Sequence, residues 1–251
     1  TQDQLIQAEK LNAVGLLASG VAHEVRNPLQ IIIQGVNYLE KRISAKEGDI
    51  FETLAILKDG VKRADKIIAG LLDFSRATAL NLQPEDINPI LENSISLVKN
   101  KLTFEHIEIV RELKTVLPKV LVDKNKIEQV CINILLNAAQ AMPEGGRIII
   151  RSYTKQFEEI KNGIGNRDED HFRVGEKAVL VEFEDTGIGI SEENVRKIFD
   201  PFFTTKGPKE GTGLGLSVCR NILHMHKGLI YAESQIGKGT KLTIILKISG
   251  R

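Results

Sequence analysis

Apolar residues recur every three or four positions along the first third of the chain. They mark one stripe over residues 11–43, and after a polar stretch at 44–49 the same spacing resumes over 50–71. This spacing predicts two amphipathic helices joined as a hairpin. Two helices alone bury too little surface to be stable. We therefore expect two hairpins to pair as a four-helix bundle, which makes the protein a homodimer.

The pattern changes at residues 79–89, where helical spacing stops and Pro84 and Pro89 enter. We place a domain boundary here, between a helical domain at 1–82 and a second domain at 83–251. In the second domain we expect helices at 89–101, 124–142, 192–199 and 214–226. We expect strands at 106–112, 147–155, 178–185, 229–234 and 241–248. This order predicts an α/β domain with helices on one face of a mixed sheet.

Composition narrows the class of protein. Of the 251 residues, 42% are hydrophobic and 27% are charged, which excludes collagen-like, disordered and disulfide-framework proteins. A net charge of +1 gives no global attraction to nucleic acid or to an anionic membrane. Cys131 and Cys219 lie in apolar helical patterns, which favours a reducing compartment.

The ends of the chain suggest part of a longer protein. The sequence lacks an initiator Met and begins inside a helical pattern, with no signal peptide before it. No apolar run reaches the roughly 18–20 residues that span a bilayer. We expect a cytoplasmic segment of a longer chain, which makes no membrane contact itself.

One histidine lies away from the apolar stripe, in the run GVAHEVRNPL. Glu24 follows His23, Asn27 lies four residues later on the same helical face, and Pro28 removes a helical hydrogen bond at a cost of about 3 kcal/mol. A solvated surface histidine is the plain alternative. A neutral imidazole is a competent nucleophile at neutral pH when a carboxylate accepts the proton from its other nitrogen, and Glu24 is the natural carboxylate.

The second domain has no P-loop sequence but carries other motifs typical of a nucleotide site. Asn133 and Asn137 lie one turn apart on a helix, and their amide oxygens suit a Mg²⁺ ion that phosphates and water also coordinate. Asp185 leaves a strand in DTGIGI, where Gly187 and Gly189 allow close approach to a flat ligand. Either motif alone has a plain alternative, a solvated asparagine pair or a turn-capping aspartate.

Two glycine-containing motifs follow. FDPFFTTK at 199–206 precedes GTGLGL at 211–216, which opens a helix and so presents free amides and the positive end of the helix dipole to an anion such as phosphate. Lys206 could neutralise phosphate charge or simply be solvated. The acidic stretch at 168–171 could suggest metal binding, but we favour a solvated hairpin loop at 158–176.

In this order, the motifs resemble the H, N, first Gly, F and second Gly boxes of the sensor histidine kinases of two-component systems. The resemblance covers nearly the whole chain, and it implies a parent chain with an upstream sensor region and a membrane tether. It implies a dimerisation and phosphoacceptor domain followed by an α/β sandwich ATP-binding domain of the Bergerat type. It also implies that His23 is autophosphorylated, that Glu24 accepts its proton, and that Asn27 orients a water that dephosphorylates the partner response regulator.

The same resemblance assigns the nucleotide site. Asp185 would bind the adenine amine, Thr240 would share a water with Asp185, and Asn137, supported by Asn133, would coordinate Mg²⁺. Residues 199–213 would form a mobile lid. The other nucleotide-binding residues that it implies are Gly187, Gly189, Lys206, Gly211, Thr212, Gly213, Leu214 and Gly215.

The ATP-hydrolysing members of the superfamily that shares this ATP-binding fold resemble each other in carrying a water-activating Glu where this chain has Asn133. Without that base, the γ-phosphoryl group would survive until His23 arrives. We therefore expect phosphorylation of His23 by ATP and transfer to an Asp of a response-regulator receiver domain. Transfer within one protomer or across the dimer is left open. The alternative function is an ATP-binding dimeric interaction module without phosphotransfer.

Overall fold

The computed structural model describes residues 25, 29–40, 48–75, 80–157, 172–205 and 213–250. The chain divides into two compact units, one drawn from residues 1–78 and 206–214 and the other from 79–205 and 215–251. Some of the predicted site residues and the acidic stretch at 168–171 lie outside the described residues. The site residues concerned are His23, Glu24, Asn27, Lys206, Gly211 and Thr212.

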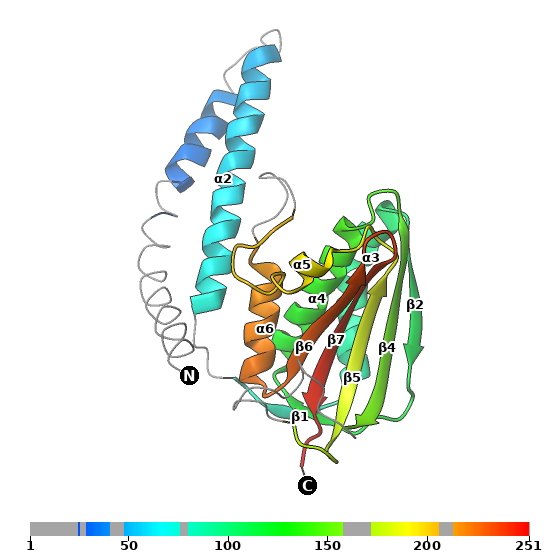
Figure 1. Ribbon diagram of the computed structural model, residues 1–251. Coiled ribbons are helices and arrows are strands. Elements are labelled where there is room, and N and C mark those ends of the chain that lie inside the picture. Colours follow the sequence, from blue (N-terminus) through cyan, green and yellow to red (C-terminus); the bar gives the residue numbers. More distant parts are fainter. Residues whose placement is uncertain are drawn as a thin grey trace. The chain divides into compact units, whose positions relative to one another are not determined.

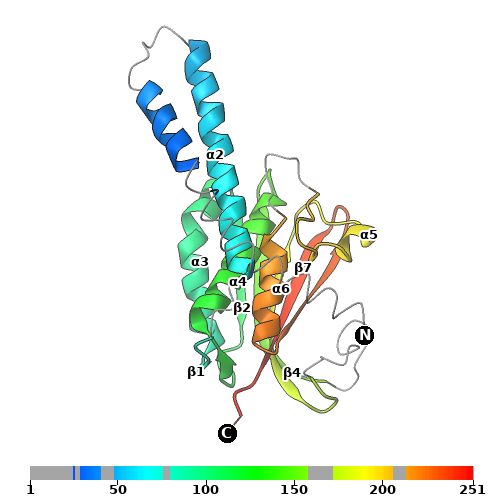
Figure 2. The same cartoon turned by 90° about the vertical axis from the view of Figure 1, so that its left-hand side faces the viewer.

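The helical unit contains a helix at residues 29–40 and helix α2 (Gly48–Ser75), which run side by side in Figures 1 and 2. Leu29 packs against Ile68, and the Lys58 ammonium donates to a Glu40 carboxylate oxygen at 2.8 Å. These two contacts make the helices antiparallel, which confirms the predicted hairpin. Helix α2 begins at Gly48, inside the polar stretch expected to form the turn.

The second unit is built on a five-stranded sheet in the order β2-β4-β5-β7-β6. Its strands are β2 (Ile107–Leu113), β4 (Gly146–Gln156), β5 (Lys177–Asp185), β6 (Leu229–Gln235) and β7 (Gly239–Lys247). Strands β2 and β4 are parallel, and the other neighbours are antiparallel. Helices α3 (Ile87–Phe104), α4 (Lys124–Gln140) and α6 (Gly215–Met225) cover one face (Figures 1 and 2), so the predicted α/β layer is confirmed.

The structure differs from the sequence-based elements in two places. Strands β1 (Gln83–Glu85) and β3 (Val120–Val122) form an antiparallel ribbon that the sequence did not reveal, because Pro84 in this edge ribbon suggests only a break. The helix expected at 192–199 ends early, as α5 (Glu192–Val195). Pro201 disfavours helical geometry at the residue before it, so the chain continues through turns.

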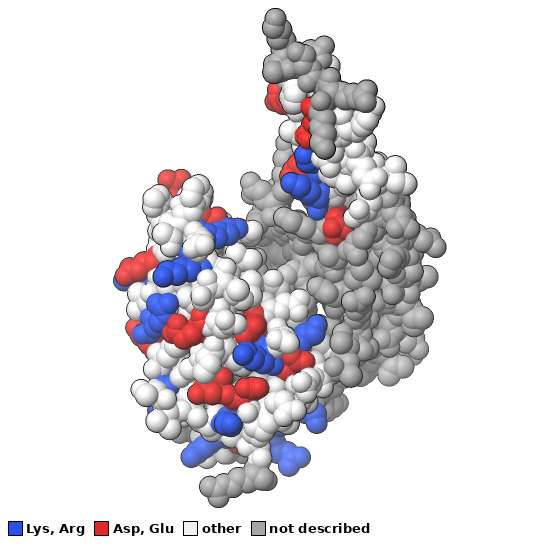
Figure 3. Space-filling model, turned by 180° about the vertical axis from the view of Figure 1, so that it is seen from behind, with Lys and Arg blue, Asp and Glu red and all other residues white. Residues whose placement is uncertain are grey.

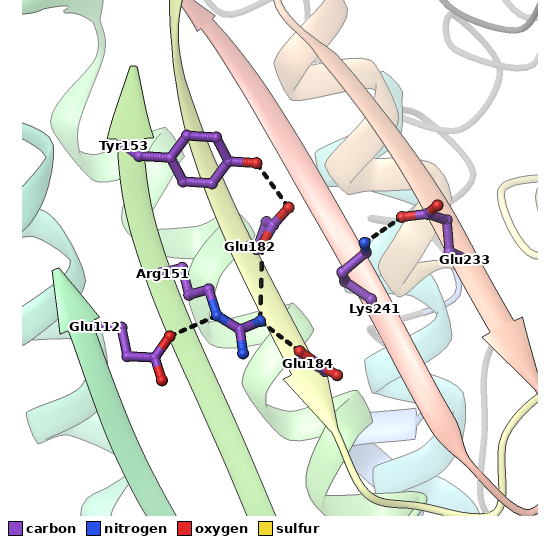
Figure 4. Close-up of polar contacts among 7 residues, drawn as sticks. All are labelled: Glu112, Arg151, Tyr153, Glu182, Glu184, Glu233 and Lys241. Carbon is purple, nitrogen blue, oxygen red and sulfur yellow. Dashed lines mark hydrogen bonds and ion pairs between the residues drawn. The ribbon is translucent and has the colours of Figure 1, made fainter. Parts of the chain in front are cut away.

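The face of the sheet opposite the helices carries a polar network (Figure 4). Arg151 on β4 donates to Glu112 on β2 at 2.6 Å and also contacts Glu184 on β5. The Tyr153 hydroxyl donates to Glu182 at 2.8 Å. Further along the same face, Phe157 and Phe172 cover an apolar cluster of Ala178, Leu180 and Ile245. Arg151 therefore links β2 and β5 across β4.

Charges of both signs are interspersed over the face of the molecule shown in Figure 3. Among the described residues, no helix is both long enough and apolar enough to cross a membrane.

Candidate nucleotide site

Asp185 ends β5 with its carboxylate held in one orientation. Its Oδ1 atom accepts hydrogen bonds from the backbone amides of Gly187 (2.9 Å) and Thr240 (3.2 Å). The second bond follows from strand register, because Asp185 and Thr240 are partners across β5 and β7. Burial raises the pKa of this carboxyl, and the two amide donors lower it. Both donors contact Oδ1, which leaves Oδ2 outside these two bonds.

The glycines after Asp185 are required by close packing of the protein itself. A Cβ atom on Gly187 would lie 2.6 Å from the carbonyl oxygen of Ala141, and one on Gly189, whose φ is +70°, would lie 2.0 Å from that of Gln235. The loop therefore rests against the residue that follows α4 and against the end of β6. Sequence reasoning attributed these glycines to a flat ligand, whereas neighbouring backbone already demands them.

Ser234 is a site residue that sequence reasoning missed. Its hydroxyl accepts from the Ile190 amide at 2.8 Å, donates to the Gly239 carbonyl at 2.8 Å and lies 2.9 Å from the Thr240 hydroxyl. It joins the loop after Asp185 to the strand that carries Thr240. No motif marks it, but the hairpin pairing of β6 with β7 places it opposite Thr240.

The two asparagines of α4 have different surroundings. A Cβ atom on Gly215, the first residue of α6, would lie 3.7 Å from Asn137 Nδ2, so this amide faces the start of α6. Asn133 lies near the Cys219 thiol, whose pKa it lowers against the effect of burial. Gly213, with φ +66°, and buried Leu214 immediately precede α6.

Both cysteines are structural. Cys131 and Cys219 are free and buried, and burial raises the pKa of each thiol to about 12. Within the part of the chain that the structure describes, no three His, Cys, Asp or Glu side chains are grouped so as to hold a metal ion.

Comparison with protein families decides the identity. The model of the His Kinase A (phospho-acceptor) domain matches residues 13–80. The model described as histidine kinase-, DNA gyrase B-, and HSP90-like ATPase matches residues 122–250. The chain belongs to the sensor histidine kinases. In this histidine kinase, α3 and β2 lie between the two matched regions, yet the structure includes both in the unit that carries Asp185.

Known proteins resemble this histidine kinase over nearly all its length. Sensor histidine kinase ZraS of Escherichia coli (strain K12) is 34% identical over 248 residues, which are 99% of this chain and 48% of ZraS. The chain thus spans about half the length of that relative. Histidine kinase ThkA in complex with response regulator protein TrrA is 26% identical with a TM-score of 0.65, covering 99% of this chain and 66% of that one.

A further solved structure shows the same fold. Full-length ShkA in complex with AMPPNP is 21% identical with a TM-score of 0.69, over 93% of this chain and 46% of that one.

Proposed function

We propose that this region of the histidine kinase binds MgATP in the α/β domain, 83–251, phosphorylates His23 in the helical domain, 1–82, and passes the phosphoryl group to an Asp of a response regulator. The observation that carries the proposal is the buried Asp185 carboxylate, oriented by two backbone amides at the end of β5. A buried acceptor fixed in this way suits the exocyclic amine of adenine. The ATPase family model, which spans this strand, supports the same ligand.

At the adenine end, Asp185 Oδ2 would accept a hydrogen bond from the amine while Oδ1 keeps its two amide donors. Thr240 would share a water with this carboxylate, and Ser234 holds the Thr240 hydroxyl at 2.9 Å. Because each oxygen of Asp185 then has its own partners, the carboxylate stays fixed as the nucleotide binds.

At the phosphate end, the side chains present fit Mg²⁺. Asn137 offers a neutral amide oxygen where α4 faces the start of α6, and phosphate and water oxygens can complete an octahedral shell. Asn133, one turn earlier on α4, would support Asn137. When bound, the ion would neutralise phosphate charge. The first amides of α6, beginning at Gly215, and Lys206 would hold the phosphates.

In the transfer step, an imidazole nitrogen of His23 attacks the γ-phosphorus and forms a P–N bond. The bond from that phosphorus to the β,γ-bridging oxygen breaks, and ADP leaves with the electron pair. Glu24 accepts the proton from the other imidazole nitrogen as the P–N bond forms, so that the phosphorylated ring is neutral. In the reverse mode, Asn27 would position water to remove the phosphoryl group from the regulator.

The partners follow from the helical unit and the relatives. Apolar side chains of the hairpin remain exposed in one protomer, including Ile31 and Ile56, and a second copy would cover them in a four-helix bundle. ThkA was solved with a response regulator protein, which supports a receiver domain as the second partner.

Radiolabelled ATP tests the proposal. With the label on the γ-phosphate, the chain should acquire radioactivity that is labile in acid and stable in base, as expected of a phosphoramidate. His23→Ala should remove the label, whereas His224→Ala, an exposed histidine on α6, should keep it. Nucleotide binding without any labelled protein would leave only the dimeric interaction module.

A further inference from the structure

His226 is buried just after α6 and belongs to none of the motifs above. Its Nδ1 atom lies 2.7 Å from the carbonyl oxygen of Ile222, and its Nε2 atom accepts a hydrogen bond from the backbone amide of Asp123 at 2.9 Å. A carbonyl can only accept and an amide can only donate. The ring therefore carries its proton on Nδ1 and is neutral.

Asp123, whose amide binds His226, also contacts two other parts of the unit. Asp123 precedes α4, and its Oδ1 atom accepts from the amides of Asn125 and Lys126, which caps the helix. Its Oδ2 atom accepts from the amide of Asn81 at 3.1 Å. Asn81 lies at the start of the second unit, in the segment through which the chain enters from the helical unit. One aspartate therefore joins that segment, α4 and the end of α6.

Helices α4 and α6 are in contact at three levels along their length. At one end Gly215 lies close to Asn137, and in the middle the Cys219 thiol approaches the carbonyl oxygen of Val130 at 3.8 Å. At the other end His226 binds Asp123. Gly215 and Asn137, at the first end, are candidate phosphate and metal ligands. The contact of His226 lies at the opposite end. Because helices are stiff, a change of register at one end is passed to the other.

We propose that His226 is a positioning residue of the nucleotide site, which holds α4 and α6 in register from the end opposite Asn137 and Gly215 and ties both helices to Asn81. The inference rests on the proposed function. Without the imidazole acceptor, the partly buried Asp123 amide loses its partner, and the α4 N-terminus must shift to find another. That shift would move Asn137 relative to the first amides of α6.

Two amide side chains divide the imidazole's contacts. His226→Gln can place its oxygen near the position of Nε2 and keep an acceptor for the Asp123 amide. His226→Asn can place its NH₂ group near Nδ1 and keep only the donor to Ile222. His224→Gln, at an exposed position of α6, is the matched control. The probe is AMPPNP with Mg²⁺, titrated into the full chain well below its unfolding temperature, and amide hydrogen exchange is followed at Asn81 and Asp123.

We expect His226→Asn to weaken AMPPNP binding about tenfold and to speed exchange at both amides, because a buried donor loses its acceptor. His226→Gln and the His224→Gln control should bind within about twofold of the wild type, since neither removes that acceptor. Rescue by Gln would show that an acceptor within reach of the Asp123 amide is required, because Asn and Gln carry the same amide group and differ by one methylene.

Unchanged AMPPNP affinity in a folded His226→Asn protein, or equal loss in both amide variants, would overturn the inference alone. A wild-type chain that binds no AMPPNP would overturn the proposed function, and with it this inference. Faster exchange confined to Asp123 would remove Asn81 from the linkage.

Discussion

The two units of this histidine kinase differ in how completely a single chain buries their apolar side chains. In the α/β unit, core side chains such as Ile127, Leu135 and Ile148 are fully buried by their own unit. In the hairpin, Val36 and Leu54 are buried, but Leu57 on the next part of the α2 stripe is 48% exposed. The α/β unit therefore has a core complete in one chain, whereas the hairpin leaves apolar side chains exposed that the proposed second copy would cover. In the proposed function, nucleotide binding belongs to the α/β unit and dimerisation belongs to the hairpin. A substitution can therefore perturb one without the other.

The largest effect is expected from a charge in the hairpin stripe. Leu57→Asp would place a carboxylate in the apolar contact between two hairpins, where it has no compensating partner. We expect the dimer dissociation constant to rise about 1000-fold, or about 4 kcal/mol. Analytical ultracentrifugation measures the constant, and AMPPNP titration shows whether the α/β unit still binds.

The matched control is Leu97→Asp, at an exposed leucine on α3. It introduces the same charge into the α/β unit, where the core is already closed, and should leave the dimer intact. If both variants dissociated equally, the two units would not differ in the way described.

Within the α/β unit, the next largest effect is expected at Gly239. Its φ is +96°, and a Cβ atom there would lie 1.9 Å from the carbonyl oxygen of Asp185. Gly239→Ala should destabilise this unit by about 3 kcal/mol, since backbone strain and a clash add. Gly237→Ala, with φ +76° and open space around the Cβ position, should cost only about 1 kcal/mol. Urea denaturation measures both, and equal losses would rule out the clash with Asp185.

The fold was predictable where a pattern is long enough to repeat. Helix α4 and strand β5 are amphipathic or apolar over several turns or pairs, so their ends agree with expectation within a few residues. The β1–β3 ribbon has three residues per strand, too few to show alternation, and Pro84 obscures it further. The sequence predicted a helix longer than α5, because the apolar residues after it continue a helical spacing. In the structure, the turn before Pro201 interrupts that spacing.

The site residues also differ in whether a local sequence pattern indicates them. Asp185 and Thr240 belong to short local motifs, so the sequence singles them out, and strand pairing brings them together. Ser234 has no motif, and its part depends on the loop it meets. His226 and Asp123 are 103 residues apart, and nothing in either neighbourhood indicates the other. Contacts made only by tertiary packing are the ones that sequence patterns leave out.

Asp185→Asn is expected to separate binding from stability in the α/β unit. The amide oxygen can still accept from Gly187 and Thr240, but the charge that favours the adenine amine is gone. AMPPNP affinity should fall about 30-fold, or about 2 kcal/mol. Because burial raises the pKa of this carboxyl, its ionised form destabilises the fold at neutral pH. The unfolding temperature should therefore not fall, and a large decrease would show that the carboxylate is structural.

The smallest effect is a pH dependence expected of the α/β unit. Burial lowers the pKa of His226; the contact with Ile222 and the Asp123 charge oppose this, and Lys126 adds to it. A proton then binds more weakly in the folded state than in the unfolded state, whose histidine pKa is about 6.5. The stability from the neutral ring is complete above that pH and is lost as the pH falls towards the folded pKa.

Urea midpoints of this unit, measured between about pH 8 and pH 6, should fall on acidification in the wild type and less so in His226→Gln. Acidification acts in the opposite direction through the Asp185 carboxyl, whose pKa is raised, so the difference between the wild type and His226→Gln isolates the histidine contribution. Because the unit's core is complete in one chain, its pH slope should be the same at low and high protein concentration. A slope that appeared only under dimeric conditions would mean that the hairpin contributes to the stability of the nucleotide site.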